Sequence, residues 1–427
     1  MDQAFLDNSL WRNIYCVLAG ESTGCAARDY SVGLLPGGME WLAFVLAAAA
    51  IIGLVINAVL GSVIVLIWGE RRLFGRFQSR TGPNRWGPFG LLTSVADAVK
   101  TMFKEDLVPA EADRILFNLA PVLIAAPALL VFSVIPFGVG TYVADLNIGV
   151  LFIMAITSLT TLAVLTAAWS SANRIAILSA LRSVALLVSY EIPMALAVVG
   201  VIMLAGSMSL GDIIQAQGIP FILVQPLGFF VFFLAAMAEM ARAPFDLTEA
   251  ESELAAGYLN DYASMKFGLF FLAEFMAELS TSAIVTTLFL SGWRGFDPIP
   301  SQFWFIAKLI AVLFLIIWFR MTLPRLRVDQ VLKFAWKGLF ELTMINIIVT
   351  AILIAIWPQP TTTELWYMVA INWPVAFVSI WLVSKLLGTA AYEKPHPTAD
   401  SPEYPVGSES IPASSALIID PVQEGGD

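Results

Sequence analysis

Histidine, cysteine and charged side chains are scarce in this chain of 427 residues, and each scarcity excludes a class of protein. The single histidine is His396, and the two cysteines, Cys16 and Cys25, lie near the opposite end. Haem, zinc and iron–sulfur sites take most of their ligands from these two residue types, so no metal site is expected within this chain. Only 13 % of the residues are charged, about half the fraction of a soluble chain, which argues against a soluble protein.

Long apolar runs are what the sequence has in abundance. Apolar residues make up 59 % of the chain, and runs of about 20 residues, enough to cross a hydrocarbon layer of about 30 Å, occur nine times. The pattern predicts an all-α polytopic membrane protein with about nine transmembrane helices. The expected helices cover residues 39–68, 118–135, 148–169, 183–205, 226–240, 266–290, 302–319, 338–357 and 367–387.

The net charge of −10 comes mostly from one end of the chain. Seven acids and one lysine follow from Glu393 onward, so this tail alone carries −6 and the rest is nearly balanced. Nothing in this balance indicates nucleic-acid binding. The tail, 392–427, is rich in proline, serine and acids, and we expect it to be disordered.

Lysine and arginine predict the orientation in the membrane. With residues 69–114 placed inside, the inner segments hold 19 of the 23 basic residues. Such an asymmetry indicates an N-terminus outside and a cytoplasmic C-terminus. If the outer side is oxidising, Cys16 and Cys25 can close a disulfide, and two free thiols remain the alternative.

Two inner segments, 69–114 and 241–265, are too rich in charge and glycine for simple connectors. Within the first, residues 88–103 form a candidate amphipathic helix. Its apolar side chains recur at a spacing of three to four, and Asp97, Lys100 and Lys104 take the other side. Such a helix tends to lie in the membrane interface.

Five carboxylates gather around Arg242 in the second segment. They are Glu239, Asp246, Glu249, Glu251 and Glu253. On a helix, Glu249 and Glu253 would share one face about 5–6 Å apart, where like charges make protons easier to share. The plainer interpretation is a solvated acidic loop held by Arg242.

Single acids also fall inside predicted spans. Glu191 lies about eight residues into span 183–205, roughly 12 Å deep, and Glu274 is comparably deep in span 266–290. An intramembrane acid is costly and is taken as functional by default. Glu278 shares the face of Glu274 but can equally hydrogen-bond a neighbouring helix, and Lys308 either partners an acid or reaches outward.

Arginines and aromatic residues crowd the start of the segment 69–114. Some of the arginines are ordinary positive-inside anchors, and others can pair with a partner's acids or with anionic lipids. Bulky Phe77, Trp86 and Phe89 can wall a slot for an isoprenoid tail or serve as interface anchors.

Three stretches together resemble one family. The first runs from Glu70 to Gly90 and contains Glu70-Arg71-Arg72 and Gly82-Pro83-Asn84; the second runs from Glu239 to Glu253, and the third from Tyr262 to Phe275. This pattern is similar to the quinone-site membrane subunit, the type designated H or 1, of proton-pumping NADH:quinone oxidoreductase, respiratory complex I. Two positions depart from it: Asp261 stands where Glu is usual, and Phe275 where Tyr is common.

The resemblance implies a translocase subunit of the respiratory electron-transport chain in a prokaryotic cell membrane. It would form the access path and chamber wall for quinone, its substrate, and carry the charge coupling on Glu191, Glu239, Asp246, Glu249, Glu251, Glu253 and Glu274. The chamber or a partner interface would use Arg71, Arg72, Phe77, Arg85, Trp86, Phe89, Arg242 and Phe245. Expected partners are membrane lipids, the other membrane subunits and the hydrophilic arm, including the subunit with the terminal iron–sulfur cluster. No dinucleotide fingerprint is present, so neither NADH nor flavin is expected to bind this chain.

The implied organisation has four parts. Residues 1–38 form an outer extension, 39–357 the family core of eight transmembrane helices, 358–391 an extra transmembrane helix, and 392–427 the tail.

Two rival interpretations of the function remain. One is the homologous subunit of a membrane-bound, energy-converting hydrogenase, and the other is a self-contained proton-coupled transporter.

Overall fold

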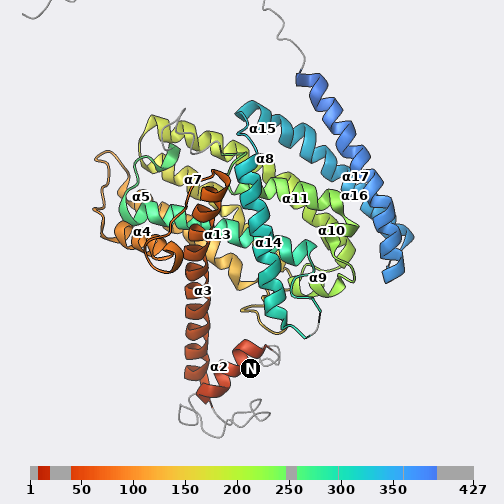
Figure 1. The fold of residues 1–427 in the computed structure, drawn as a ribbon, viewed down its shortest axis with the longest axis horizontal. Helices are drawn as coiled ribbons and strands as arrows, with labels where there is room; N and C mark the ends of the chain where they lie inside the picture. The colour runs from red at the N-terminus through yellow and green to blue at the C-terminus, as the bar shows by residue number, and fades with distance from the viewer. Residues whose placement is uncertain (1–7, 20–39, 247–256, 297, 359, 392–427) are drawn as a thin grey trace, which may run out of the picture. The chain divides into compact units, whose positions relative to one another are not determined.

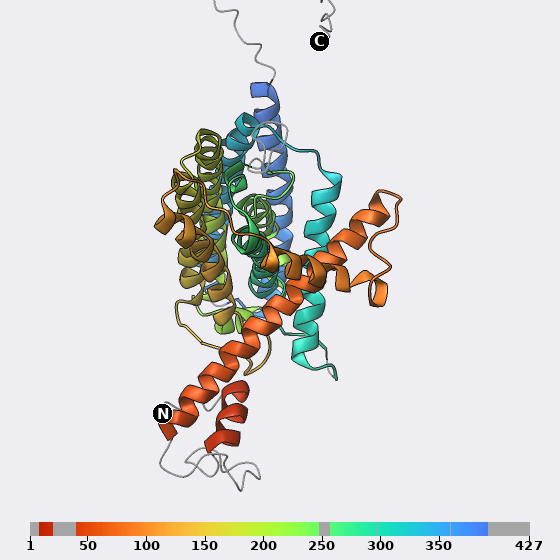
Figure 2. The same ribbon diagram turned by 90° about the vertical axis from the view of Figure 1, so that its left-hand side faces the viewer.

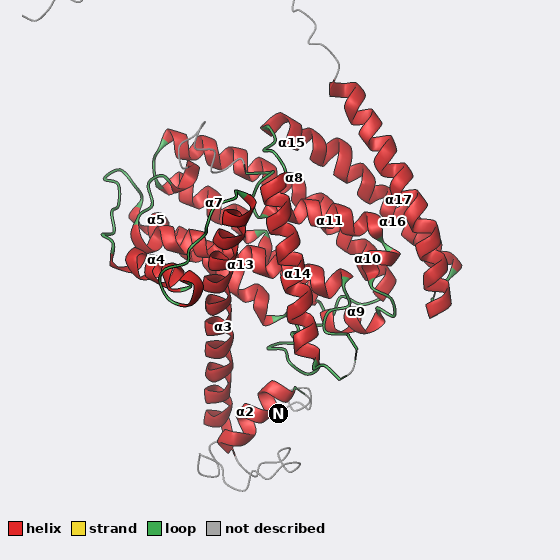
Figure 3. Cartoon of the chain, in the orientation of Figure 1, coloured by secondary structure: helices red, strands yellow, loops and turns green. Residues whose placement is uncertain are grey.

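The computed structural model describes residues 8–19, 40–246, 257–296, 298–358 and 360–391. Over these residues the chain is built from helices and loops, without a strand (Figure 3). The predicted all-α class is therefore confirmed. The contacts discussed below all lie within the unit Met1–Leu387.

Eight helical segments of the described chain are long and apolar enough to cross a membrane. They are α3 (Glu40–Phe77), α5 (Arg114–Leu130) with its extension to Ser133, α6 (Gly149–Thr157) with α7 (Leu159–Ser170), α8 (Arg174–Ala205), α13 (Ser264–Phe289), α14 (Ser301–Thr322), α15 (Val328–Phe334) continuing into α16 (Phe340–Ile356), and α17 (Thr362–Ala391). The remaining predicted span, 226–240, is α11 (Pro226–Glu239), whose 14 residues give a length of only about 21 Å.

Shorter helices connect the spans. They are α2 (Ser9–Ala19), η1 (Pro88–Gly90), α4 (Leu92–Phe103), η2 (Val131–Ser133), α9 (Leu210–Ala216), α10 (Phe221–Val224) and η3 (Gly257–Leu259). The predicted amphipathic helix is present as α4, preceded by the turn η1. The predicted outer extension contains a helix, α2, that the sequence pattern did not indicate.

Alanine allows the central helices to approach closely. Ala163 and Ala167 of α7, Ala180 and Ala197 of α8 and Ala236 of α11 are all at most 1 % exposed where these helices pack together. In a membrane, where lipid is as apolar as a leucine side chain, such small residues favour helix association by close packing. Helix α13 also lies at the centre of the molecule (Figure 1). In its most apolar stretch of 18 residues, 61 % of the residues are buried, against 22 % in the corresponding stretch of α3.

Polar caps fix the helix ends that lie near the central acids. Asp113 and Asn173 accept hydrogen bonds from the backbone N–H of Ile115 and Ile175, which stabilises the first turns of α5 and α8. Asn173 also donates to Asp261 at 3.0 Å. The loop before α13 is thereby tied to the start of α8.

A π-helical turn, Ala335–Leu339, joins α15 to α16, so this span begins at Val328 and not at residue 338 as predicted. The turn lies against α8. Tyr190 donates to the carbonyl of Val331 at 3.0 Å, and Trp336 donates to Ser189 at 3.2 Å. These bonds hold the stretch of α8 that carries Glu191.

Helix α2 packs beside the N-terminal part of α3 (Figure 2). Trp11 stacks on Phe44 with ring centroids 5.5 Å apart and donates to the carbonyl of Val143 at 2.9 Å. Cys16 is 1 % exposed and disulfide-bonded. The other cysteine of the chain, Cys25, lies outside the described residues.

Candidate functional site

Five charged residues meet where α3, α13 and α14 approach the loop that follows α11. Glu70 of α3 accepts a hydrogen bond from Arg320 of α14, and Arg242 Nη1 lies 3.8 Å from Glu70 Oε1. Arg242 Nη2 lies 3.5 Å from Glu274 Oε2 of α13. With Glu278, these residues are called the ionic cluster below. Arg242 bridges two carboxylates contributed by different helices.

Aromatic rings cover both arginines of the ionic cluster. The Phe275 ring centroid lies 4.5 Å from the guanidinium carbon of Arg242, and Phe74 lies 5.4 Å from that of Arg320. A ring face attracts a cation electrostatically and excludes water from it. Phe275 has no hydroxyl to donate, and it supports Arg242 through its ring face.

Glu278 lies one turn after Glu274 on α13 and is 1 % exposed. Neither of its carboxylate oxygens has a hydrogen-bond partner among the described residues. Its charged neighbours are Arg242, Glu70 and Arg320. It therefore belongs to the ionic cluster through electrostatics and not through hydrogen bonds.

A cavity connects the ionic cluster to the next acid. Glu239 and Glu274 line it together with hydroxyl side chains, among them Thr157, Thr160 and Thr281. The cavity offers about 100 Å³ to the centres of water molecules, several times the roughly 10–15 Å³ that one water needs. The cavity that both carboxylates line can therefore hold water.

Glu191 continues the row beyond Glu239. It is half-buried, accepts a hydrogen bond from Thr161 at 3.1 Å, and is close enough to Glu239 for their charges to interact. Glu239 also has a hydrogen bond with Thr157. The structure thus places Glu191, Glu239, Glu274, Arg242 and Glu70 in one row.

The rest of the acidic segment is only partly seen. Asp246 is half-buried and has polar or electrostatic contacts, and it directly follows Phe245. Phe245 is 2 % exposed and packs against Tyr190, with ring centroids 5.3 Å apart. The predicted residues Glu249, Glu251 and Glu253 lie outside the described residues.

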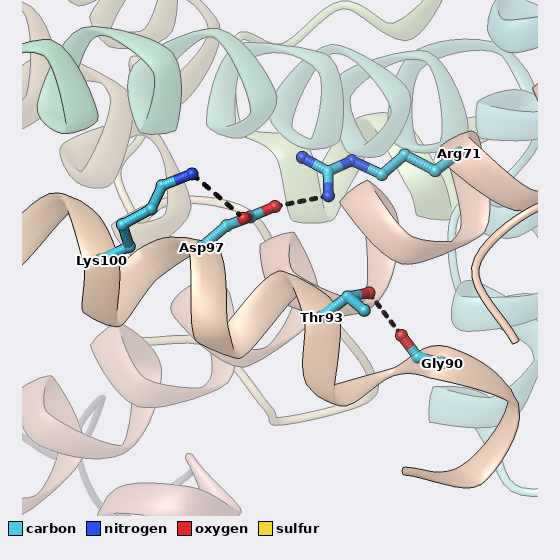
Figure 4. Close-up of polar contacts among 5 residues, drawn as sticks. All are labelled: Arg71, Gly90, Thr93, Asp97 and Lys100. Atoms are coloured by element: carbon cyan, nitrogen blue, oxygen red, sulfur yellow. Dashed lines mark hydrogen bonds and ion pairs between the residues drawn. The ribbon is translucent and has the colours of Figure 1, made fainter. Parts of the chain in front are cut away.

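A second polar site joins α3 to α4 (Figure 4). Arg71 pairs with Asp97 at 2.6 Å, Lys100 lies 3.7 Å from the same carboxylate, and Thr93 donates to the carbonyl of Gly90 at 2.6 Å. The Arg71–Asp97 pair holds the amphipathic helix against the end of α3, and the other two contacts lie within the segment formed by η1 and α4.

Arg72 and Phe89 lie together beside this site. The Arg72 guanidinium carbon is 4.9 Å from the Phe89 ring and 5.4 Å from the Trp68 ring, and Trp68 donates to the carbonyl of Phe89 at 2.9 Å. Phe89 is 64 % and Trp86 73 % exposed, and Phe77 and Arg85 are exposed as well. Of the eight residues expected at a quinone chamber or partner interface, Phe77, Arg85, Trp86 and Phe89 are therefore exposed at the α3–α4 end, where Arg71 and Arg72 are half-buried. Phe245 lies apart in the core and Arg242 in the ionic cluster.

An apolar groove of about 780 Å³ runs along α3 and α14. Val55, Val59, Leu313 and Ile317 are among its walls, and Glu70 lies at one end. The groove therefore leads along apolar helix surfaces to the ionic cluster.

Tyr262 anchors the loop that leads into α13. Its ring stacks on Phe117 with centroids 4.1 Å apart, and its hydroxyl lies 3.2 Å from both the Ser170 hydroxyl and the Ala167 carbonyl. Burial raises the pKa of the Tyr262 phenol to about 12. Lys266 pairs with Asp106 at 2.9 Å across the same junction.

Sequence reasoning did not select Glu70 or Arg320 as site residues, and it left Lys308 open. Glu70 was part of a motif, and Arg320 was grouped with the orientation signal. Each lies just beyond the end of a predicted span, residues 68 and 319, where a charged residue is ordinary, so the apolar pattern gave no signal for either. Lys308 donates to the carbonyls of Leu290, Gly292 and Arg294, so it caps a loop and partners no acid among the described residues.

Comparison with known proteins identifies relatives over most of the chain. Residues 49–351 match the NADH dehydrogenase family. The chain is 52 % identical over 327 residues to the H subunit of the NADH-quinone oxidoreductase of Dehalococcoides mccartyi, covering 77 % of this chain and 92 % of that protein. It is 46 % identical over 317 residues to the H subunit of the Brevibacillus brevis oxidoreductase, covering 73 % and 93 %. It is also 47 % identical over 296 residues to the H 2 subunit of the Cereibacter sphaeroides oxidoreductase, covering 69 % and 93 %.

Proposed function

The chain belongs to the NADH dehydrogenase family, in the group of H-type membrane subunits, and from this membership we propose that it couples quinone reduction to proton translocation through its buried carboxylates. It acts as a multi-pass membrane subunit of an NADH:quinone oxidoreductase. Other subunits of that complex bind NADH and carry the electrons.

The observation that carries this proposal is the row from Glu191 through Glu239 and the cavity to Glu274, Arg242 and Glu70. Carboxylates and water at hydrogen-bonding range can pass protons, and a low-dielectric surrounding makes each group sensitive to the charge of the next. Each ionised group buried in a membrane is costly unless compensated. A row of them on converging helices is therefore explained by proton handling better than by packing.

Quinone, the substrate, takes up electrons and protons when it is reduced next to this row. In the proposed arrangement its apolar tail lies along α3, where the groove leads to Glu70 and where α4 presents Phe89 and Arg72. The exposed basic and aromatic surface at the α3–α4 end binds the hydrophilic arm, whose terminal iron–sulfur cluster supplies electrons. In this orientation the N-terminus lies outside and the C-terminus in the cytoplasm.

The test is a Glu239→Gln variant in the assembled complex. We expect quinone reduction and proton translocation to fall, while reduction of ferricyanide by the flavin arm persists, because that reaction does not need the membrane subunit. Glu111→Gln is the matched control, since Glu111 is an exposed acid in the loop between α4 and α5. Unchanged quinone reduction and translocation in Glu239→Gln would refute the proposal, and equal loss of all three activities would indicate failed assembly.

A further inference from the structure

We propose that Glu278 is an additional proton-exchanging residue of this protein, one that holds the proton which the ionic cluster needs in order to stay near neutral charge. The inference rests on the proposed function, since it assigns a place where a proton is kept within the same row. It concerns a residue outside the three motif stretches that carry the family resemblance.

The first argument is burial without compensation by hydrogen bonds. Glu278 is 1 % exposed, and both of its oxygens lack a hydrogen-bond partner among the described residues. A carboxylate removed from water and given no donor is strongly disfavoured in its ionised form. A neutral carboxyl avoids most of that cost.

The second argument is the charge count of the ionic cluster. It contains three carboxylates, Glu70, Glu274 and Glu278, and two guanidiniums, Arg242 and Arg320. These come from every element around it: α3, α13, α14 and the loop after α11. With all five ionised, one negative charge is in excess. Coupled carboxylates in such a setting keep a shared proton, because like charges at close range cannot all ionise.

The third argument selects Glu278 as the holder of that proton. Glu70 accepts a hydrogen bond from Arg320 and lies 3.8 Å from Arg242, and Glu274 lies 3.5 Å from Arg242. Both have a cation at ion-pair distance. Glu278 interacts electrostatically with the same two arginines, but it forms no ion pair with either of them at that range.

A short path leads from the proton on Glu278 to groups that can accept it. Glu274 lies four residues before Glu278, so the two share one face of α13 about 5–6 Å apart between Cβ atoms. Glu274 also lines the cavity, which is large enough for water. A proton that leaves a Glu278 oxygen therefore passes to the Glu274 carboxylate or to a water molecule in the cavity. A shift of Arg242 toward Glu278 favours this release, and a shift back reverses it.

Infrared spectroscopy of the assembled complex tests the proposal without relying on turnover. In the resting complex, a buried protonated carboxyl gives a C=O band that moves on exchange into deuterated water. We expect Glu278→Gln to lose one such band and Glu278→Asp to restore it at a shifted position, since an aspartic acid absorbs at a different frequency. Glu111→Gln, which alters an exposed acid in the loop between α4 and α5, is expected to keep the wild-type band.

An unchanged band in an assembled Glu278→Gln complex overturns the proposal. If Glu278→Gln does not assemble, Glu278→Asp decides, because a band at the wild-type position there also overturns it. Failure of the proposed function is a separate outcome. In that case Glu239→Gln translocates protons normally, whatever the infrared bands show.

Discussion

At the scale of single residues, Arg242 links more of the site than any other described side chain. One guanidinium lies within 4 Å of Glu70 and Glu274 and against the ring of Phe275. Arginine suits this place because its planar fork can serve two carboxylates at once and stack on an aromatic face. The two helices α3 and α13 are therefore joined through a residue that belongs to neither.

Glu70→Gln is expected to destabilise the protein strongly. Glu70 is 5 % exposed and is the carboxylate shared by Arg320 and Arg242, so its loss leaves buried positive charge undercompensated. Removing one partner of a buried ion pair costs about 3–5 kcal/mol. The measurement is the thermal stability of the purified complex, together with the yield of assembled complex on native gels.

Asp97→Asn is the matched comparison, because it also converts a carboxylate paired with arginine into an amide. The Arg71–Asp97 pair is about 40 % exposed on both sides and is screened by water, so its loss costs only about 0–1 kcal/mol. Equal stability of the two variants would contradict the assignment of Glu70 to a buried cluster.

Tyr262→Phe is expected to cost about 0.5–1.5 kcal/mol at neutral pH, because the stack on Phe117 is kept while the hydroxyl contacts are lost. The native phenol has a pKa of about 12, raised by burial from 10.0. The stability from its protonated form is complete below pH 10.0 and is lost as the pH rises through about 12. Thermal stability measured in a pH series should therefore show the difference in stability between wild type and variant becoming smaller in that range. A difference that stays constant would contradict the assignment of a buried, protonated phenol.

Individual acids were predictable where they interrupt an apolar run. Glu191, Glu239 and Glu274 were found this way, and the structure brings them into one row. Which charges pair was not predictable: Glu70 and Arg320 are 250 residues apart, and no local spacing rule reaches that far. The neighbours of Glu278 depend in the same way on how three helices cross.

At the scale of elements, the turn between α3 and α4 is tightly built. A Cβ on Gly75 would lie 2.7 Å from the backbone nitrogen of Gly82, and a Cβ on Gly90 would lie 2.5 Å from the carbonyl of Pro83. Gly90 also has a φ of +85°, which favours glycine. The motif needs its glycines so that the chain can fold back on itself and present α4.

Gly90→Ala is expected to open this turn. The left-handed backbone alone costs about 1–3 kcal/mol for a residue with a side chain, and the clash with Pro83 adds to it. A lower yield of assembled complex and a lower quinone reductase activity are the expected results.

Gly53→Ala provides the control, because a Cβ there meets nothing within 4 Å and the position lies inside the helix α3. An alanine in a helix interior gains about 0.5–1 kcal/mol over glycine, so assembly should be unchanged or improved. If both variants assemble equally well, the close approach of Gly90 to the Pro83 backbone is not needed for assembly.

Helix positions followed from apolar length, and helix ends did not. The helix α3 continues to Phe77, nine residues beyond the predicted end, because charged residues such as Glu70 and Arg71 are good helix formers even though they end an apolar run. The π turn before α16 had no signal in the apolar pattern, since it changes the backbone bonding and not the composition.

At the scale of the whole molecule, the distribution of basic residues and the bonded state of Cys16 support the same orientation. A disulfide persists where the compartment is oxidising, which is the outer side of a prokaryotic cell membrane. Helix α2, which carries Cys16, packs on the N-terminal part of α3. The proposed outer location of the N-terminus can therefore be tested through its thiols.

A membrane-impermeant thiol reagent applied to intact spheroplasts should label the native chain only after reduction. The reference is Glu105→Cys in a chain whose own two cysteines are replaced by serine; Glu105 is exposed in the segment predicted to face the cytoplasm. This cysteine should react only in inverted vesicles. Labelling of the native cysteines only in inverted vesicles would reverse the proposed topology, and labelling in spheroplasts without reductant would contradict the disulfide.

The pairing of Glu70 with Arg320 has a consequence for how the chain is made. At a synthesis rate of about 5–20 residues per second, Arg320 leaves the ribosome roughly 12–50 s after Glu70. Arg242, the other arginine beside Glu70, is synthesised within that interval, and until it appears the acid of the first span has no arginine partner. Biogenesis must therefore keep Glu70 at the lipid headgroups until its arginines arrive, and insertion of α14 is the last step that joins the first helix to the ionic cluster.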